Sequence, residues 1–289
     1  MRILCLGSTE SWYLKDLQRA AGERHEVVPA TFRQLHAEIS ESGLEAGSGS
    51  FDATTADCIL VRTMPRGSLE QVVFRMDALG RLQAAGLTII NPPRAIEIAV
   101  DKFLATAKLQ AAGLAVPRTA CCQTVDEAMT YFERLEGSVV VKPLFGGEGR
   151  GITRLDDEAL ALRAFTMLEQ LGAVIYLQEF VPHEGRDVRV LVIGDRVLAA
   201  ERCNPYDWRT NVSRGATMQP VELTPELADT ARRAAQAVET PFAGVDLLPG
   251  KDGQLYAIEV NAVPGWRALG RTLNMDIARV VLDYLESLD

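Results

Sequence analysis

In the N-terminal third of the chain, short apolar runs alternate with stretches that carry helical spacing. An apolar run flanked by turn residues predicts a buried strand, and apolar residues three and four apart predict one face of a helix. The predicted strands are Met1–Leu6, Glu26–Val28, Asp57–Val61 and Thr88–Ile90, and the predicted helices are Trp12–Ala21 and Leu69–Ala85. Strands that alternate with helices imply a small parallel α/β domain. The polar stretch Gly47–Ser50 is expected to be a surface loop.

The pattern changes after Pro93, where one long helix is predicted over Ala95–Ala112 and ends at Gly113. The next predicted elements are an extended segment from Val116, a helix at Asp126–Leu135, a strand at Ser138–Pro143 and, from Tyr176 onward, mostly strands. Two hairpins are expected, Val188–Ile193 with Val197–Glu201 and Val245–Leu248 with Gln254–Val260, together with helices at Pro225–Glu239 and Met275–Leu288. This part of the chain therefore differs in architecture from the N-terminal third.

Composition restricts the class of protein. The 289 residues are 47% hydrophobic and 24% charged, which is ordinary for a soluble protein of two domains or three small ones. Lys and Arg number 30 against 39 Asp and Glu, a net charge of −9 that argues against a domain built to grip a nucleic-acid backbone. The apolar run Ile3–Leu6 is too short for a signal-peptide core, and no membrane segment is visible, so a cytoplasmic location is expected.

Cysteine and histidine usage excludes several kinds of chemistry. The five cysteines are odd in number and lack CxxC spacing, so neither a disulfide framework nor a zinc site is predicted. The three histidines, His25, His36 and His183, lie far apart in the sequence. A histidine-rich metal site or a histidine-based triad is therefore not expected.

A glycine-rich loop follows the predicted strand Ser138–Pro143. Gly146, Gly147, Gly149 and Gly151 allow backbone N–H groups to approach an anion closely. The loop is not a Walker motif, because Ile152 stands where that motif requires lysine. Read alone, the loop is either the tip of a hairpin or a phosphate loop. Lys142 just before it favours the phosphate loop, since a lone charge at the end of an apolar strand needs an anionic partner.

Oxygen ligands gather in the second predicted hairpin. Strict alternation along 254–261 puts Ala257, Glu259 and Asn261 on one face of the strand, with Tyr256, Ile258 and Val260 on the other. Asp246 lies in the preceding strand, where burying an unpaired carboxylate is costly. Two carboxylates and an amide oxygen suit Mg²⁺ that is also held by phosphates and water. The alternative is a solvated outer strand face.

Arginines form a third group of candidates. Arg189, Arg202, Arg209 and Arg214 lie in or next to predicted strands, and arginine presents a planar fork of donors to phosphate or carboxylate. Surface salt bridges are the alternative for any one of them. Gln178–Val181 lies where a strand gives way to a loop, a place where backbone groups could recognise a base edge.

Together these segments resemble the ATP-grasp superfamily and, within it, the RimK-like glutamate ligases. The resemblance covers roughly residues 95–270, in the order Asp101-Lys102, Val141-Lys142-Pro143 with Gly146–Gly151, Gln178–Val181, Asp187–Arg189, Arg209–Gly215, Val245-Asp246 and Glu259–Gly265. It implies a mixed α/β and α+β fold, in which a Rossmann-like pre-ATP-grasp domain precedes a two-part ATP-grasp fold. The implied boundaries are 1–94 for the first domain, 95–180 for the small subdomain with the glycine loop and 181–289 for the C-terminal subdomain with the metal site.

The resemblance also implies roles for individual residues. Those implied to bind ATP are Lys102, Lys142, Gly146, Gly147, Gly149, Gln178, Glu179, Val181 and Asp187, the two lysines at the phosphates and Gln178, Glu179 and Val181 at adenine and ribose. Asp246, Glu259 and Asn261 would hold Mg²⁺ or Mn²⁺, with two ions expected. Arg189, Arg202, Asn211 and Ser213 would act on the transferred phosphoryl group or the acid, and Arg209, Arg214, Trp266 and Arg267 would contact substrate.

The activity implied by the resemblance is carboxylate–amine ligation through an acyl-phosphate, with ATP, a small-molecule acid and an amino acid as substrates. The family usually has Ala-Ser-Pro-Gly after the metal asparagine, whereas this chain has Ala262-Val263-Pro264-Gly265-Trp266-Arg267. This departure favours a small-molecule acceptor such as a pterin-type coenzyme over a protein tail. Another ATP-grasp peptide ligase and a non-catalytic ATP-binding regulatory protein are the alternatives. Association into homodimers or homotetramers is implied as well.

Overall fold

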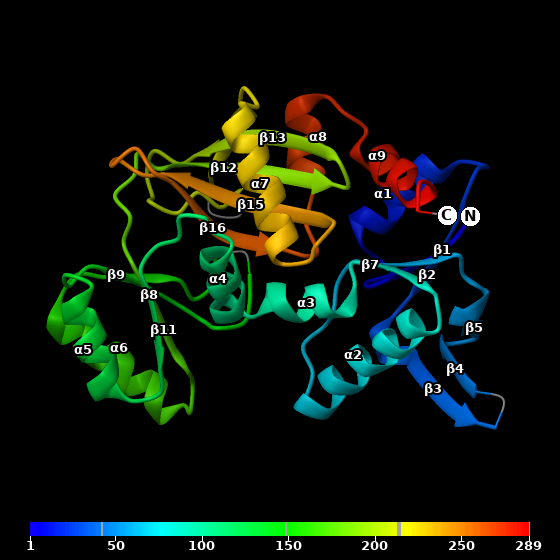
Figure 1. Ribbon diagram of the computed structural model, residues 1–289, viewed down its shortest axis with the longest axis horizontal. Helices are drawn as coiled ribbons and strands as arrows, with labels where there is room; N and C mark the ends of the chain where they lie inside the picture. Colours follow the sequence, from blue (N-terminus) through cyan, green and yellow to red (C-terminus); the bar gives the residue numbers. More distant parts are fainter. Residues whose placement is uncertain (42, 148, 213–214, 289) are drawn as a thin grey trace.

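The N-terminal domain is a parallel α/β sheet, as the hydrophobic pattern predicts. The computed structural model describes residues 1–41, 43–147, 149–212 and 215–288 (Figure 1). Strands β1 (Arg2–Leu6), β2 (Glu26–Ala30), β6 (Cys58–Val61) and β7 (Thr88–Ile90) pair in the order β2-β1-β6-β7, all parallel. Helices α1 (Trp12–Ala21) and α2 (Leu69–Ala84) connect them.

An antiparallel extension that the sequence did not predict lies between β2 and β6. It consists of β3 (Leu35–Ser40), β4 (Gly43–Ser48) and β5 (Phe51–Asp52), flanked by short 3₁₀ turns at Phe32–Gln34 and Ala53–Thr55. The expectation of a surface loop over Gly47–Ser50 is therefore wrong at Gly47 and Ser48. Ser48 is only 6% exposed, because its hydroxyl accepts from the Thr31 N–H and donates to the Thr31 carbonyl.

The predicted helix over Ala95–Ala112 is two helices, α3 (Pro93–Val100) and α4 (Lys102–Ala111). The chain breaks at Asp101, whose carboxylate caps α4 by accepting from the Leu104 N–H. Ile98 and Leu109 pack in the core beneath the C-terminal sheet. Ile96 of α3 packs instead in the core of the N-terminal domain, so α3 contacts both domains, whereas the expected boundaries place residues 95–180 in the small subdomain.

The small subdomain is an antiparallel sheet covered by two helices. Strands β8 (Thr119–Cys122), β9 (Val139–Lys142), β10 (Thr153–Leu155) and β11 (Ile175–Glu179) pair in the order β10-β9-β11-β8. Helices α5 (Val125–Arg134) and α6 (Glu158–Gln170) pack together on this sheet (Figure 1). Phe132 and Phe165 meet edge to face in a hydrophobic core of its own.

The C-terminal subdomain carries the larger antiparallel sheet, and both predicted hairpins are confirmed. Its strands β12 (Arg186–Ile193), β13 (Arg196–Cys203), β14 (Thr217–Pro220), β15 (Phe242–Pro249) and β16 (Leu255–Asn261) pair in the order β14-β13-β12-β15-β16. Alternation along β12 sends Val190 toward α7 (Pro225–Ala237) and Leu191 toward α8 (Arg267–Leu273) and α9 (Ile277–Glu286). The sheet is therefore buried between two helical layers.

The N-terminal domain and the C-terminal subdomain share one hydrophobic core. Helix α1 packs against α9, and Leu17 lies in the same buried cluster as Phe242 and Leu282 (Figure 1). Among the described residues, no helix is long and apolar enough to cross a membrane.

Candidate active site

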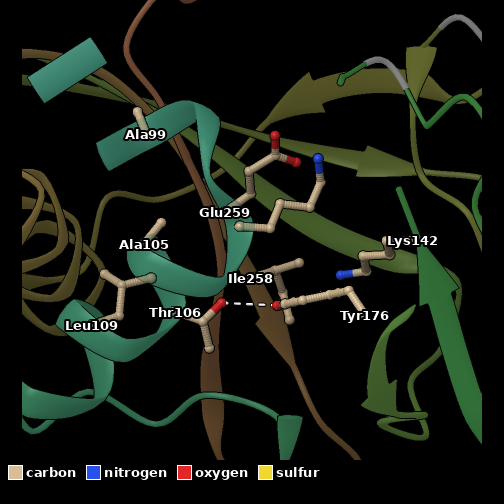
Figure 2. A pocket seen from close by; sticks show the side chains of 9 residues that line it. Ala99, Ala105, Thr106, Leu109, Lys142, Tyr176, Ile258 and Glu259 are labelled. Atoms are coloured by element: carbon tan, nitrogen blue, oxygen red, sulfur yellow. Dashed lines mark hydrogen bonds between the residues drawn. The ribbon is translucent and has the colours of Figure 1, made fainter. Parts of the chain in front are cut away.

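Two predicted phosphate-binding lysines meet between the small and C-terminal subdomains. Lys102 begins α4 and lines a small cavity. Lys142, which ends β9, and Glu259 of β16 line the same cavity (Figure 2). The Lys102 Nζ donates to the Gly146 carbonyl at 2.6 Å, and the Lys142 Nζ donates to Gln178 Oε1 at 2.5 Å. Burial lowers the pKa of Lys102 and lowers that of Lys142 to about 8. An anion between them would relieve this cost.

A buried hydrogen bond, which sequence reasoning missed, joins α4, the helix of Lys102, to β11, the strand that pairs with the strand of Lys142. Tyr176 of β11 lies opposite Lys142 in the sheet, and its hydroxyl is 3.0 Å from the Thr106 hydroxyl, one helical turn after Lys102 (Figure 2). Tyr176 is 1% exposed. The available signal was its position two residues before Gln178, which puts both side chains on one face of the strand.

The β15–β16 hairpin brings Asp246 and Glu259 directly opposite each other. The pairing then shifts, so that Leu247 faces Ala257 and Ile258 is the extra residue of a bulge. Ala257 consequently lies in the core with Val260, which corrects the strict alternation predicted for this strand. Burial and the charge of Asp246 raise the pKa of the Glu259 carboxyl. A cation placed between the two carboxylates would lower this repulsion.

Asp246 of β15 is held by Arg189 of the adjacent strand β12 and by Arg202 of β13, one strand further away. Arg189 Nη1 donates to Asp246 Oδ1 at 2.7 Å, and Arg202 Nη2 lies 3.0 Å from Asp246 Oδ2. Burial alone would raise the pKa of Asp246, but these guanidinium groups outweigh it and keep that pKa below its usual value. Arg202 also forms a two-bond ion pair with Asp187 at 2.7 and 2.5 Å. Asp187, expected at ATP, therefore points to Arg202, and burial raises its pKa.

The donor set fits a divalent cation that phosphates also coordinate. Asp246 and Glu259 provide carboxylates, and Asn261 follows on β16, where its Oδ1 accepts from the Val263 N–H at 2.8 Å and keeps a second lone pair. Within the described ranges, no group of three or more His, Cys, Asp or Glu side chains could hold a metal ion. An ion at this place thus depends on Asn261 and on phosphate oxygens.

The predicted adenine segment crosses from β11 into the C-terminal subdomain. Gln178 is buried and bridges Lys142 and Thr119, while Glu179 Oε1 accepts from the Arg118 N–H at 2.8 Å. Val181 is buried next to Gly250 in the turn between β15 and β16. This connection links the two subdomains directly beside Lys142.

The glycine loop approaches the segment between β13 and β14. Gly146 and Gly149 have positive φ angles of 123° and 68°, which glycine adopts readily. A Cβ added to Gly149 would lie 2.4 Å from Asn211 Oδ1, so the predicted loop and Asn211 are brought together. Gly147 is exposed. Ser213 and Arg214, both predicted to contact substrate or phosphoryl group, lie outside the described residues.

The remaining predicted substrate residues do not gather at one place. Trp266 is 1% exposed, packs in the core between α1 and the C-terminal sheet, and donates its indole N–H to Asp16 at 2.9 Å. Its prediction as a substrate contact is therefore wrong. Arg267 is exposed and stacks on Trp12, with its guanidinium carbon 5.1 Å from the ring. Arg209 pairs with Asp207 and donates to the Ile152 carbonyl after the glycine loop.

The low pKa of Lys142 leads to a pH prediction. Because burial brings that pKa to about 8, the free protein loses the positive charge at this position as the pH rises through 8. We expect kcat/KM for ATP, which reports groups of the free enzyme, to fall above about pH 8. Lys142→Arg should move the fall to higher pH, since arginine keeps its proton. Lys15→Arg, an exposed control, should follow the wild type, and an unchanged profile in Lys142→Arg would contradict this assignment.

Comparison with known proteins agrees with this geometry. Residues 99–285 match the family model of the RimK-like ATP-grasp domain. The chain is 29% identical over 321 residues to the tetrahydromethanopterin:alpha-L-glutamate ligase of Methanosarcina acetivorans, covering 99% of this chain and 98% of that protein. It is 34% identical over 236 residues to the ligase of the same name from Methanocaldococcus jannaschii, with 79% of each covered. The ATP-grasp ligase PsnB complexed with minimal precursor has the same fold, with a TM-score of 0.79, 24% identity and 99% of both chains covered. The chain belongs to the RimK-like ATP-grasp family of ATP-dependent ligases.

Proposed function

We propose that this protein adds L-glutamate to a carboxylate-bearing small molecule, a pterin-type coenzyme, with consumption of ATP. The observation that carries this proposal is the similarity, over nearly the whole chain, to ligases named for tetrahydromethanopterin and L-glutamate. The lysines, carboxylates and arginines between the subdomains support it, because they suit the transfer of a phosphoryl group to an acid.

The proposed reaction has two steps. A carboxylate oxygen of the acceptor attacks the γ-phosphorus of ATP, the bond to the β–γ bridging oxygen breaks, and ADP leaves. The glutamate amine then attacks the acyl carbon, phosphate leaves with the bonding electrons, and the nitrogen loses a proton to give an amide. No enzyme nucleophile takes part, because phosphorylation alone turns a poor leaving group into a good one.

In this reaction the side chains bind and balance charge. Lys102 and Lys142 would hold the phosphates, and Arg189 would face the transferring group. Asp246, Glu259 and Asn261 would hold Mg²⁺ or Mn²⁺, which supplies positive charge between phosphate oxygens when bound. We include two ions in the proposal, since one ATP and two carboxylates offer ligands for both.

The glycine loop and the adenine segment complete the proposed ATP site. Gly146, Gly147 and Gly149 would cover the phosphates and keep water from the acyl-phosphate. Gln178, Glu179 and Val181 would hold adenine and ribose. Dimer or tetramer formation stays a prediction of the family resemblance, and a cytoplasmic location stays a prediction of the sequence pattern.

The choice of acceptor no longer rests on Trp266, which is buried. Among the substitutions that follow Asn261, exposed Arg267 remains as a cation for an acidic substrate. A peptide or protein tail would need the same chemistry at its carboxylate. A panel of defined acceptor compounds therefore tests the choice of a pterin-type coenzyme directly.

The test measures ADP release from the purified protein with Mg-ATP, L-glutamate and a panel of acceptors. The panel contains pterin coenzymes, a deazaflavin coenzyme and ribosomal protein tails, and mass spectrometry follows the products. We expect one pterin coenzyme to stimulate ADP release and to gain the mass of a glutamyl unit. Glutamylation of a protein tail alone would overturn the choice of acceptor. If the protein binds ATP but releases no ADP with any acceptor of the panel, a regulatory role would be favoured over ligation.

A further inference from the structure

Two buried polar residues of the N-terminal domain contact the segment that follows β16. Arg62 comes directly after β6, and Asn91 directly after β7, so both lie at the carboxyl edge of the parallel sheet. The segment they contact, Ala262–Trp266, starts at the residue after Asn261. Neither residue belongs to the ATP site described above.

Arg62 is buried, and in the part of the chain that the structure describes its positive charge has no acidic partner. It is 4% exposed, and its Nη2 donates to the Pro264 carbonyl at 2.7 Å. Its guanidinium carbon lies 4.4 Å from the ring centre of Trp266, 5.1 Å from that of Tyr13 and 5.5 Å from that of Phe242. Its Nε and Nη1 are buried and have no hydrogen-bond partner among the described residues. Aromatic faces thus surround the charge.

A buried arginine in these surroundings is not expected to stabilise the fold. Burying a charge without a counter-ion costs free energy, and well-packed apolar replacements of buried ionic groups are often neutral or stabilising. Burial also lowers the pKa of Arg62 to about 10, which reflects that cost. Buried charges are normally paired. Where a protein keeps an unpaired one without a gain in stability, a functional role is expected.

Asn91 contacts both strands of the proposed metal hairpin at their ends. Its Nδ2 donates to the carbonyls of Phe242 at 2.7 Å and Ala262 at 2.5 Å, and its Oδ1 accepts from the Phe242 N–H at 3.0 Å. Phe242 begins β15, and Ala262 follows β16. The N-terminal sheet therefore holds the metal hairpin at Phe242 and at two carbonyls after Asn261.

We propose that Arg62 is a positioning residue of the ligase: by binding the Pro264 carbonyl and stacking on Trp266, it holds Ala262–Trp266 so that Asn261 stays beside Glu259. The inference rests on the metal role proposed for Asn261. Pro264 is three residues from Asn261, at most about 11 Å along an extended chain, so Arg62 acts through this segment and not on the reacting atoms. A displacement of about 1 Å at a catalytic group costs roughly a hundredfold in rate.

The test compares Arg62→Met with Arg66→Met, which removes an exposed arginine from the same loop. We expect Arg62→Met to stay folded, because methionine fills an apolar space and removes an unpaired buried charge. Its kcat should fall about tenfold or more, while KM for ATP changes little. Hydrogen exchange over 259–267 should speed up, since the Val263 N–H bound to Asn261 loses its support. Arg66→Met should match the wild type in all three measurements.

Arg62→Lys keeps the charge without the planar stacking and should give values between wild type and Arg62→Met, so it carries the test if the methionine variant does not fold. Wild-type kcat in Arg62→Met, within about twofold, would overturn the inference. A raised KM for glutamate or acceptor with unchanged kcat would also overturn it, because Arg62 would then bind substrate directly. Exchange is measured without substrate, so it tests the inference even where the proposed acceptor is wrong.

Discussion

Glu259→Ala is expected to lower kcat for ligation roughly a hundredfold to a thousandfold, the effect of removing one group that stabilises developing charge. Glu259 lies opposite Asp246 and lines the cavity with Lys102 and Lys142. The fold should stay intact, because burial and Asp246 already raise the pKa of this carboxyl and its removal ends that repulsion. The measurement is acceptor-dependent ADP release, with thermal unfolding followed by circular dichroism.

The matched control is Glu222→Ala, which removes an exposed carboxylate outside the sheet strands. Its turnover should equal that of the wild type. Glu259→Gln keeps the shape of the side chain and should show nearly the loss of the alanine variant, since the missing property is the negative charge that a cation needs. Full turnover in either Glu259 variant at intact fold would remove Glu259 from the metal site.

The second large effect is expected from Arg202→Met, which should reduce the free energy of unfolding by about 3–5 kcal/mol. Arg202 is the shared partner of Asp187 and Asp246, all three of them buried. Its loss removes the ion pair of Asp187 and one of the two ion pairs of Asp246, whose pair with Arg189 stays. A buried carboxylate without a partner pays its desolvation cost in full. Urea unfolding at constant pH measures the change.

Two comparisons separate this effect from a general loss of charge. Arg94→Met removes an exposed arginine paired with Glu97 and should change stability by about 0.5 kcal/mol or less. Adding Asp187→Asn to Arg202→Met should recover part of the loss, since the uncompensated charge disappears. If Arg202→Met were as stable as Arg94→Met, the ion pairs of Arg202 with Asp187 and Asp246 would not contribute to the stability of the fold.

The sequence by itself determined the elements and the chemistry that local patterns encode. Helix α1, the two hairpins of the C-terminal sheet and the parallel N-terminal sheet follow from periodicity and turn residues. The ordered combination of segments from Asp101-Lys102 to Glu259–Gly265, with the glycine loop between them, indicated an ATP-grasp protein. Spacing along one strand is local information, and Asp246 and Glu259 lie opposite each other because one hairpin joins them.

Only the tertiary structure decided which of these residues meet and which are buried. Trp266 is in the core because α1, distant in sequence, supplies Asp16 and Leu17 around it. Ile258 forms a bulge because Leu247 pairs with Ala257 and Asp246 with Glu259. The Tyr176 hydroxyl forms a hydrogen bond with Thr106, a residue 70 positions earlier in the chain. Arg62 reaches Pro264 across 202 positions of sequence. Partners brought together by packing leave no period or spacing along the chain, so the sequence pattern could not contain them.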